Sequence, residues 1–397
     1  MDIPRIISVD DHVVEPPDLW TERIPAKYQD RRPRVERDSA IFHFEGGMFS
    51  YEKGVDGGEP CDWWLYDDLV YPFPKLSAAV GFPELDVTPT TFDEIRPGCW
   101  IKSERIADMD ANHTEASICF PNTLPRFCGQ TFLERDDKEL ALLCVKAYND
   151  WMVEDWCAGE GQGRLIPLTM VPLWDVELAA AEVRRCADLG SFAVTFPENP
   201  FPLGLPSIHD KDHHWEPFFQ ACQDTQTTIC MHIGSSSKMP ATSVDAPPAV
   251  AATLSFGNAM SSLSDFLFSG VLVRFPNLKL AYSEGQIGWI PYALERADNT
   301  WEYHSNWTRA KEAIPEPPST YYWGRIFGCF TNDMHGMTSI AEVGEDNICF
   351  ETDYPHTDTT WPFAQQEAAR MTAGLTDEQR YKILRGNAIR MLELDRV

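Results

Sequence analysis

The chain has 397 residues, of which 43% are hydrophobic, and its formal net charge is −28 at pH 7. A surface this acidic repels nucleic acids and anionic membranes, so the charge excludes both as partners. The length exceeds the roughly 250 residues of a simple eight-fold barrel, so we expect one enzyme domain, residues 1–397, that carries a sizeable insertion.

The cysteines indicate a reducing environment. The chain has eleven, an odd number, scattered and without a Cys-x-x-Cys pair. Several lie inside apolar runs, which is typical of reduced core residues in a cytoplasmic protein. No apolar run approaches the roughly 18 residues of a membrane span. We therefore expect a cytoplasmic protein.

The first predicted strand covers residues 5–9, which are β-branched and apolar. It leads directly into Asp10, Asp11 and His12. Residues 13–100 are rich in proline and glycine and show no sustained helical period. We expect this segment to be an insertion with little regular structure that covers the barrel mouth or contacts a partner subunit.

From residue 101 onward, apolar strand-like runs alternate with segments of helical spacing. The further predicted strands are 116–120, 164–170, 192–196, 227–231, 278–283, 326–330 and 347–352. The predicted helices include 101–112, 136–159, 176–189, 287–304 and those from residue 376 onward. Eight strands separated by helices, without a Gly-x-Gly-x-x-Gly turn after the first, favour a (β/α)8 TIM barrel over a doubly wound nucleotide-binding fold.

Five potential metal ligands stand where predicted strands end. Asp10 and His12 follow the first strand, His232 the fifth, Glu284 the sixth and Asp353 the eighth. The carboxyl ends of parallel barrel strands meet at one face, so these side chains can surround one cavity. Two imidazoles and three carboxylates suit Zn, Mn and Fe.

Four of the polar residues near these strand ends have more than one interpretation. Glu284 is either a ligand or a carboxylate at the start of the following helix. His356 is either a further ligand or a structural histidine of a proline turn. Glu15 either supports the ligands or caps the turn into Pro16, and Glu198, after the fourth strand, is a weak candidate.

Several stretches together resemble the amidohydrolase superfamily, and within it the branch related to aminocarboxymuconate-semialdehyde decarboxylase. They are residues 7–17, 105–110, 231–234, 282–289, 351–356 and 386–388. The resemblance covers nearly the whole chain and implies a metal bound by Asp10, His12, His232 and Asp353. The chain departs from the family pattern twice, with Asp10 where a histidine is common and Glu284 where the family keeps a catalytic histidine.

A glutamate in place of the catalytic histidine is suited to binding or bridging metals. Two or three histidines with three or more carboxylates are also the donor set of dinuclear iron proteins that activate oxygen. The sequence resembles the TIM-barrel nonheme diiron monooxygenases of platensimycin and platencin diterpenoid biosynthesis. That resemblance implies two iron ions, with Glu284 and His356 among their ligands.

The same resemblance implies a reaction and partners. A monooxygenase of this kind uses O2 and an external electron donor to hydroxylate an unactivated carbon of a hydrophobic, diterpenoid-like acid, including acids carried as coenzyme A thioesters. The family also implies a homodimer. Basic residues between 23 and 37 could bind coenzyme A phosphates, or form a solvated face balanced by nearby acids.

The alternative is a mononuclear zinc or manganese hydrolase or nonoxidative decarboxylase. In that enzyme Glu284 acts as acid or base, and the metal survives its removal. A non-catalytic binding protein on an enzyme fold is disfavoured, because the charged residues at the barrel mouth are costly to keep together without a metal.

Overall fold

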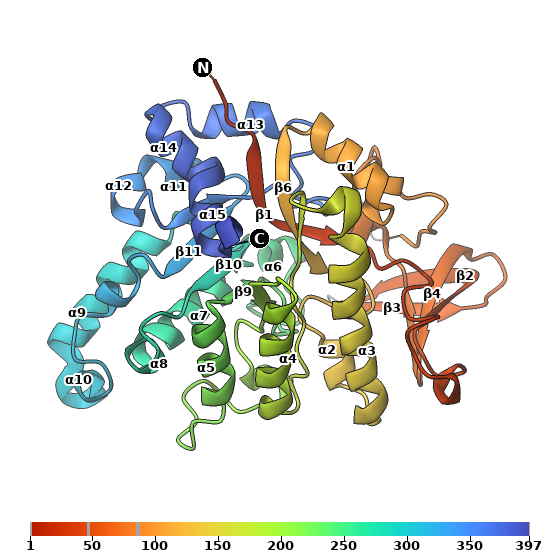
Figure 1. The fold of residues 1–397 in the computed structure, drawn as a ribbon, viewed down its shortest axis with the longest axis horizontal. Coiled ribbons are helices and arrows are strands. Elements are labelled where there is room, and N and C mark those ends of the chain that lie inside the picture. The colour runs from red at the N-terminus through yellow and green to blue at the C-terminus, as the bar shows by residue number, and fades with distance from the viewer. Residues whose placement is uncertain (1, 46–47, 85–87, 397) are drawn as a thin grey trace.

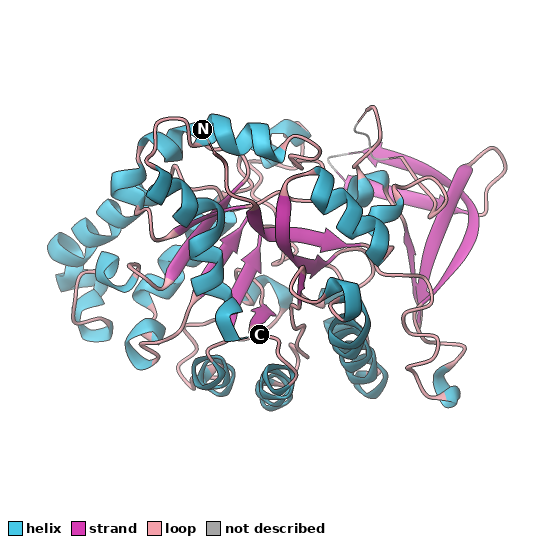
Figure 2. Ribbon diagram, turned by 45° about the horizontal axis from the view of Figure 1, so that its top comes forward, coloured by secondary structure: helices cyan, strands magenta, loops and turns pink. Residues whose placement is uncertain are grey.

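The computed structural model describes residues 2–45, 48–84 and 88–396, and its centre is a barrel of parallel strands. Helices surround these strands (Figure 1, Figure 2). The barrel strands are β1 Ile6–Val13, β6 Thr114–Pro121, β7 Leu165–Ile166, β8 Ala193–Thr195, β9 Thr228–His232, β10 Leu280–Ser283, β11 Ile326–Phe330 and β12 Ile348–Phe350. The predicted (β/α)8 fold is confirmed.

Two short connections close the barrel. Strands β1, β6 and β7 pair in that order, and β8 to β12 pair in theirs. A parallel bridge between Thr169 and Val194 joins β7 to β8. The amide of Asp353 donates a 2.9 Å hydrogen bond to the carbonyl of Asp10, which joins the β12 end to β1. Residues from both chain ends therefore lie side by side.

The helices mostly follow the strands as the sequence predicts. They are α1 Lys102–Ala111, α2 Gln130–Leu133, α3 Lys138–Trp151, α4 Val176–Asp188, α5 Glu216–Thr225, α6 Pro248–Thr253, α7 Gly257–Phe268, α8 Val271–Arg274, α9 Ile290–Thr308, α10 Ala310–Ala313, α11 Met334–Thr338, α12 Ile340–Val343, α13 Ala364–Met371, α14 Asp377–Tyr381 and α15 Asn387–Leu392. Helix α9 begins three residues later than predicted. Glu284 and Gln286 have left-handed backbone angles, which end β10 in a turn before the helix can form.

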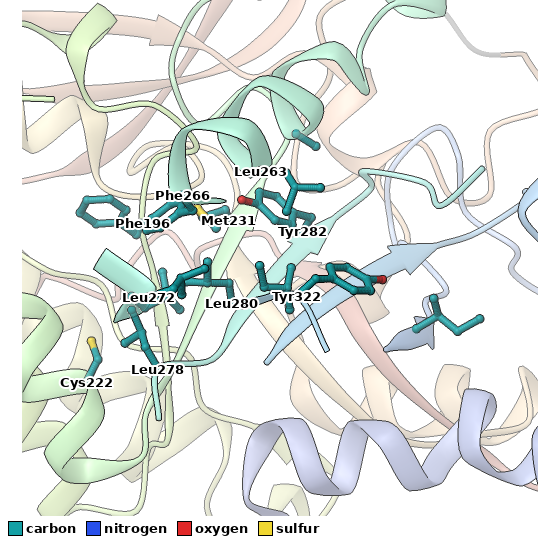
Figure 3. Close-up of a cluster of buried hydrophobic side chains, with 14 of the residues drawn as sticks. Phe196, Cys222, Met231, Leu263, Phe266, Leu272, Leu278, Leu280, Tyr282 and Tyr322 are labelled. Atoms are coloured by element: carbon teal, nitrogen blue, oxygen red, sulfur yellow. The ribbon is translucent and has the colours of Figure 1, made fainter. Parts of the chain in front are cut away.

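The strands bury both of their faces. Cys230 and Ala281 belong to the cluster inside the barrel, which α15 closes with Ala388 and Met391. Alternate residues of the same strands, such as Met231, Leu280 and Tyr282, pack outward with Leu263 and Phe266 of α7 (Figure 3). A strand buried on both faces is a continuous apolar run, which is why the sequence pattern located these strands.

The first strand is longer than predicted, and it carries an irregularity. Its register with β6 shifts between Ser8 and Asp11, so β1 contains one extra residue there. A bulge of this kind reverses which side chains face inward. Val9 lies in the interior cluster, and beyond the bulge Asp10 and His12 approach His232 across the barrel. The ligand candidates therefore belong to β1 itself instead of following it.

The insertion contains a four-stranded antiparallel sheet, so the prediction of little regular structure was wrong. Its strands are β2 Arg34–Glu45, β3 Met48–Lys53, β4 Glu59–Tyr66 and β5 Leu69–Pro72, in the order β3-β2-β4-β5. In Figure 1 the sheet lies at one side of the barrel. Strand β4 buries Trp63 on one face and Trp64 on the other, so it lacks the polar alternation that marks a half-exposed strand.

All eleven cysteines are buried and free, which confirms their prediction as core residues. In the described part of the chain, no helix combines the length and the apolar character needed to cross a bilayer.

Candidate metal centre

The five predicted ligands meet at the carboxyl end of the barrel. The Nε2 atoms of His12 and His232 lie 3.0 Å apart. Asp10 stands beside both, with one oxygen 3.5 Å from His12 Nε2 and the other 3.4 Å from His232 Nε2. Asp353 Oδ1 is 3.6 Å from His12 Nε2, and Glu284 Oε2 is 3.2 Å from His232 Nε2.

His356, which the sequence left open, lies in the same cluster. Its Nδ1 atom is 3.4 Å from Asp353 Oδ1, and its ring stacks on that of His12 with a centroid distance of 3.6 Å. The six side chains form three overlapping groups whose ligand atoms lie within 4.8 Å of one another. The groups are His12, His232 and His356; Asp10, His232 and Glu284; and Glu284, Asp353 and His356.

The donor atoms fit a divalent cation. Among the described residues, neither carboxylate oxygen of Asp10 or of Asp353 has a hydrogen-bond partner, although both residues are fully buried. Buried carboxylates are normally hydrogen-bonded or paired, since an isolated one is costly. Imidazole nitrogens and carboxylate oxygens in this mixture bind Mn, Zn or Fe. A cation bound in the cluster would give these carboxylates the positive partner that they lack.

Neighbouring groups hold two imidazoles in ligand form. His232 Nδ1 lies 2.6 Å from the carbonyl of Ile233, so it donates a proton there and leaves the Nε2 lone pair facing the cluster. His356 Nε2 lies 3.1 Å from Asn122 Oδ1, which leaves its Nδ1 lone pair facing Asp353. Burial and the neighbouring His356 lower the pKa of His232 to about 3, so this ring is neutral.

The carboxyl groups crowd one another. Burial raises the pKa of Asp10 well above its usual value, and the nearby carboxylates of Glu351, Glu284 and Asp353 raise it further. Burial and the neighbouring Asp353 also raise the pKa of Glu284 well above the ordinary value. A bound cation would lower these pKa values again, because it favours the ionised carboxylates.

Glu351 is a buried member of this group that sequence reasoning did not single out. One of its oxygens accepts a hydrogen bond from the amide of Glu284 at 3.1 Å, and the other has no partner among the described residues. Glu351 stands two residues before Asp353, which is the spacing of side chains on one face of an extended strand. That spacing is the signal that could have found it.

Asp11 and Glu15 support the site from outside the cluster. Asp11 accepts hydrogen bonds from Thr352 Oγ1 at 2.6 Å, from the amide of Tyr354 at 2.9 Å and from the hydroxyl of Ser117. Glu15 accepts the amides of Asn122 at 2.7 Å and Thr123 at 2.9 Å. Asp11 thereby joins β1 to the β12 end, and Glu15 positions the loop that carries Asn122.

Glu198 follows β8 and is buried. Neither of its oxygens makes a well-formed hydrogen bond to the described residues. Burial raises its pKa to about 8, an effect that the Gly234 amide and the Asn258 side chain only partly offset. Glu284 lies near enough for its charge to raise this pKa further.

A cavity of about 460 Å³ opens beside the cluster. Glu284 and His356 line it, whereas Asp10, His12, His232 and Asp353 do not. Its other walls come from the insertion and from the loops after β6, β9 and β12. These residues are Tyr71, Leu76, Ser77, Asn122, Arg126, Phe127, Gln130, Ile233, Gly234, Met239, Ala252, Ser255, Thr357 and Asp358. Sequence reasoning named none of them as cavity residues, because they gather from separate segments.

Asp10 and Asp11 differ in their hydrogen bonding, so replacing Asp10 should affect metal binding and replacing Asp11 should affect stability. Asp10→Asn should abolish metal binding yet leave the chelated protein as stable as wild type or more so, because it removes an unpartnered buried carboxylate. Asp11→Asn should lower the free energy of unfolding by about 1–3 kcal/mol, because it disturbs several buried hydrogen bonds. Urea unfolding in chelator and elemental analysis measure the two effects. Equal destabilisation by both variants would contradict this division of roles.

The raised pKa of Glu198 predicts that the stability of the folded chain depends on pH. Its pKa in the folded chain, about 8, lies above the ordinary value of 4.5, so its contribution to stability is complete below pH 4.5 and is lost as the pH rises toward 8. We therefore compare the free energies of unfolding of Glu198→Gln and wild type in chelated protein. The variant should gain roughly 2–4 kcal/mol more over wild type at pH 8 than at pH 4.5, because each unit of pKa shift corresponds to about 1.4 kcal/mol. Denaturant titrations at both pH values test this. The same difference from wild type at both would refute it.

Comparison with known proteins places this site in a family. The amidohydrolase family model matches residues 62–394. The 2-amino-3-carboxymuconate-6-semialdehyde decarboxylase of Dictyostelium discoideum is 23% identical over 314 residues, which cover 77% of this chain and 80% of that protein. The gamma-resorcylate decarboxylase of Polaromonas sp. (strain JS666) is 25% identical over 260 residues, covering 62% and 76% respectively.

Solved structures share the fold. An amidohydrolase from Mycobacterium avium subsp. paratuberculosis K-10 superposes with a TM-score of 0.69 at 20% identity, covering 98% of this chain and 99% of that one. A dihydroxybenzoic acid decarboxylase from Polaromonas sp. JS666, solved with bound manganese and the inhibitor 2-nitroresorcinol, gives 0.61 at 18% identity, covering 100% and 98%. The family match spans most of the sequence and the fold agrees along its whole length; the chain belongs to the amidohydrolase family.

Proposed function

We propose that this protein is a metal-dependent nonoxidative decarboxylase of a hydrophobic, aromatic-type carboxylic acid. The observation that carries the proposal is the division of the six clustered side chains into those that line the cavity and those that do not. Asp10, His12, His232 and Asp353 stand away from the cavity, while Glu284 and His356 line it. The four withdrawn residues would hold one divalent cation, and Glu284 would act on a substrate in the cavity.

The relatives support this reaction over the oxygenase that the sequence resemblance implies. Both curated relatives described above are named as decarboxylases, and one related decarboxylase was solved with manganese. The mononuclear alternative from the sequence therefore becomes the leading proposal, with manganese or zinc as the metal.

The reaction needs a proton donor and a dry pocket. The carboxylate leaves as CO2, the electron pair of the broken C–C bond stays on the substrate carbon, and that carbon takes up one proton. When bound, the cation supplies positive charge that holds and orients an acidic substrate. Glu284, whose side chain lines the cavity, would deliver the proton. Phe127, Leu76 and Met239 would exclude water around the carbon skeleton.

Replacement of Glu284 tests this assignment. Glu284→Gln should keep close to one metal per chain and lose at least about 100-fold in CO2 release, because general acid catalysis contributes roughly 10²–10⁴-fold. Glu295→Gln, on the exposed side of α9, is the matched control and should change neither quantity. The measurements are elemental analysis and CO2 release from a panel of hydroxybenzoates. Loss of one of two metals in Glu284→Gln would reject the assignment.

A second candidate, a dinuclear iron monooxygenase, is favoured by the size of the donor set. Six side chains form overlapping groups, and Glu284 belongs to two of them, so it could bridge two cations. This enzyme would use O2 and an external electron donor. The idea that it uses coenzyme A thioesters gains no support from the basic run, because Arg23, Lys27 and Arg31 do not line the cavity beside the cluster.

Metal content separates the two candidates. For the decarboxylase, protein from cells grown with iron and manganese should hold close to one metal per chain, and His356→Asn should retain it. For the oxygenase, wild type should hold close to two irons, and His356→Asn should lose one, since His356 belongs to two of the three groups of donors. Oxygen consumption with reductant and candidate acids provides an independent readout. Two irons per chain would overturn the decarboxylase proposal.

A further inference from the structure

We propose that Arg126 binds a second negatively charged group of the substrate, in addition to the carboxylate that is lost. The inference rests on the proposed function, because it names the substrate class of the same cavity. Among the described residues that line the cavity, Arg126 is the only lysine or arginine. The other charged lining groups, Glu284 and Asp358, are acids.

The backbone at Arg126 is unusual for a large side chain. Its φ is +60°, in the left-handed region that residues other than glycine seldom adopt. Such conformations persist where the surrounding structure holds them, and they gather at ligand-binding sites. The neighbouring Phe127 also lines the cavity and packs beside His232, with ring centroids 4.1 Å apart. The loop after β6 thus brings a cation and an aromatic ring to the cavity together.

Two contacts fix the guanidinium while leaving it able to bind a ligand. Nη1 of Arg126 donates to Glu134 Oε1 at 2.7 Å, and Nη2 donates to the hydroxyl of Ser237. Each terminal nitrogen carries two N–H groups and uses one of them in these bonds. The side chain is 31% exposed, although it lines a cavity. A guanidinium held in this way is arranged to receive a carboxylate, which matches its planar shape.

The insertion provides a further polar group beside Arg126. Tyr71 of β5 lines the same cavity, and the positive charge of Arg126 lies close enough to offset part of the rise in pKa that burial causes at Tyr71. An anion bound by Arg126 would therefore also meet the Tyr71 side chain. This places the insertion, the loop after β6 and the loop after β9 around one end of the cavity.

Charge explains why a second anionic group needs this arginine. The chain has a net charge of −28, and its cavity contains two acids. An anion entering such a cavity is repelled unless a local cation compensates. The metal centre would serve the carboxylate that leaves, and Arg126 would serve another charged group. The substrate class is therefore an acid with two negative groups on an apolar framework that fits Leu76, Phe127 and Met239.

The test compares two ligands of nearly equal shape. Naphthalene-2,6-dicarboxylate carries two negative charges, and in 6-carbamoylnaphthalene-2-carboxylate an amide replaces one of them. Isothermal titration calorimetry on the manganese-loaded protein measures both dissociation constants. Wild type should bind the dicarboxylate at least about tenfold more tightly, the scale of one hydrogen-bonded charge pair. Arg126→Met should remove this preference, and Arg126→Lys should keep part of it.

Two further variants separate ligand binding from a scaffold role. Glu134→Gln removes the carboxylate that shares the guanidinium, so the preference for the dicarboxylate should stay the same or increase. Arg184→Met, a surface arginine paired with Asp224, is the control and should change nothing. If Arg126→Met fails to fold, Arg126→Gln replaces it, because it also removes the positive charge while keeping a polar side chain, and it should lose the preference in the same way.

Three results would overturn the proposal: no preference in wild type, an unchanged preference in Arg126→Met, or a preference that falls in Glu134→Gln. Failure of the proposed function would give a different result. CO2 release would be absent, but wild type would still prefer the dicarboxylate and Arg126→Met would still lose that preference.

Discussion

The structure depends on the cost of bringing acidic side chains together inside the barrel. Asp10, Asp353, Glu284 and Glu351 crowd around His12 and His232, and burial raises the pKa of all four carboxyl groups. The buried Arg105 donates to the backbone carbonyl of His12 instead of to these carboxylates. Such an arrangement is unfavourable unless a cation completes it, so the cluster is best understood as a metal centre.

The surrounding fold holds that cluster in place. The bulge in β1 aims Asp10 and His12 inward, and Asp11 ties the same strand to Thr352 and Tyr354. Glu284 and Asp353 both have left-handed backbone angles, so the ends of β10 and β12 also bear strain. Ligands on strands and on strained, hydrogen-bonded turns are positioned before a metal arrives, which favours affinity and defined geometry.

The loops and the insertion form the walls of the cavity beside the metal centre. The barrel is shared with relatives at low identity and says little about the substrate. The cavity walls come from β5, from the loop after β6 and from the segment after β9, which lie far apart in sequence. Arg126 is the cation in this wall, so it is the residue through which the same metal site could select a different class of acid.

The barrel and most of the candidate metal site could be predicted from the sequence. Strands buried on both faces are continuous apolar runs, and Asp10, His12, His232, Glu284 and Asp353 stand at their carboxyl ends, where barrel geometry brings them together. It did not reveal the insertion sheet, whose β4 buries aromatic residues on both faces, nor the bulge in β1. The cavity shared by Arg126, Tyr71 and His356 could not be predicted, because residues from separate segments approach one another through packing that no local sequence pattern records.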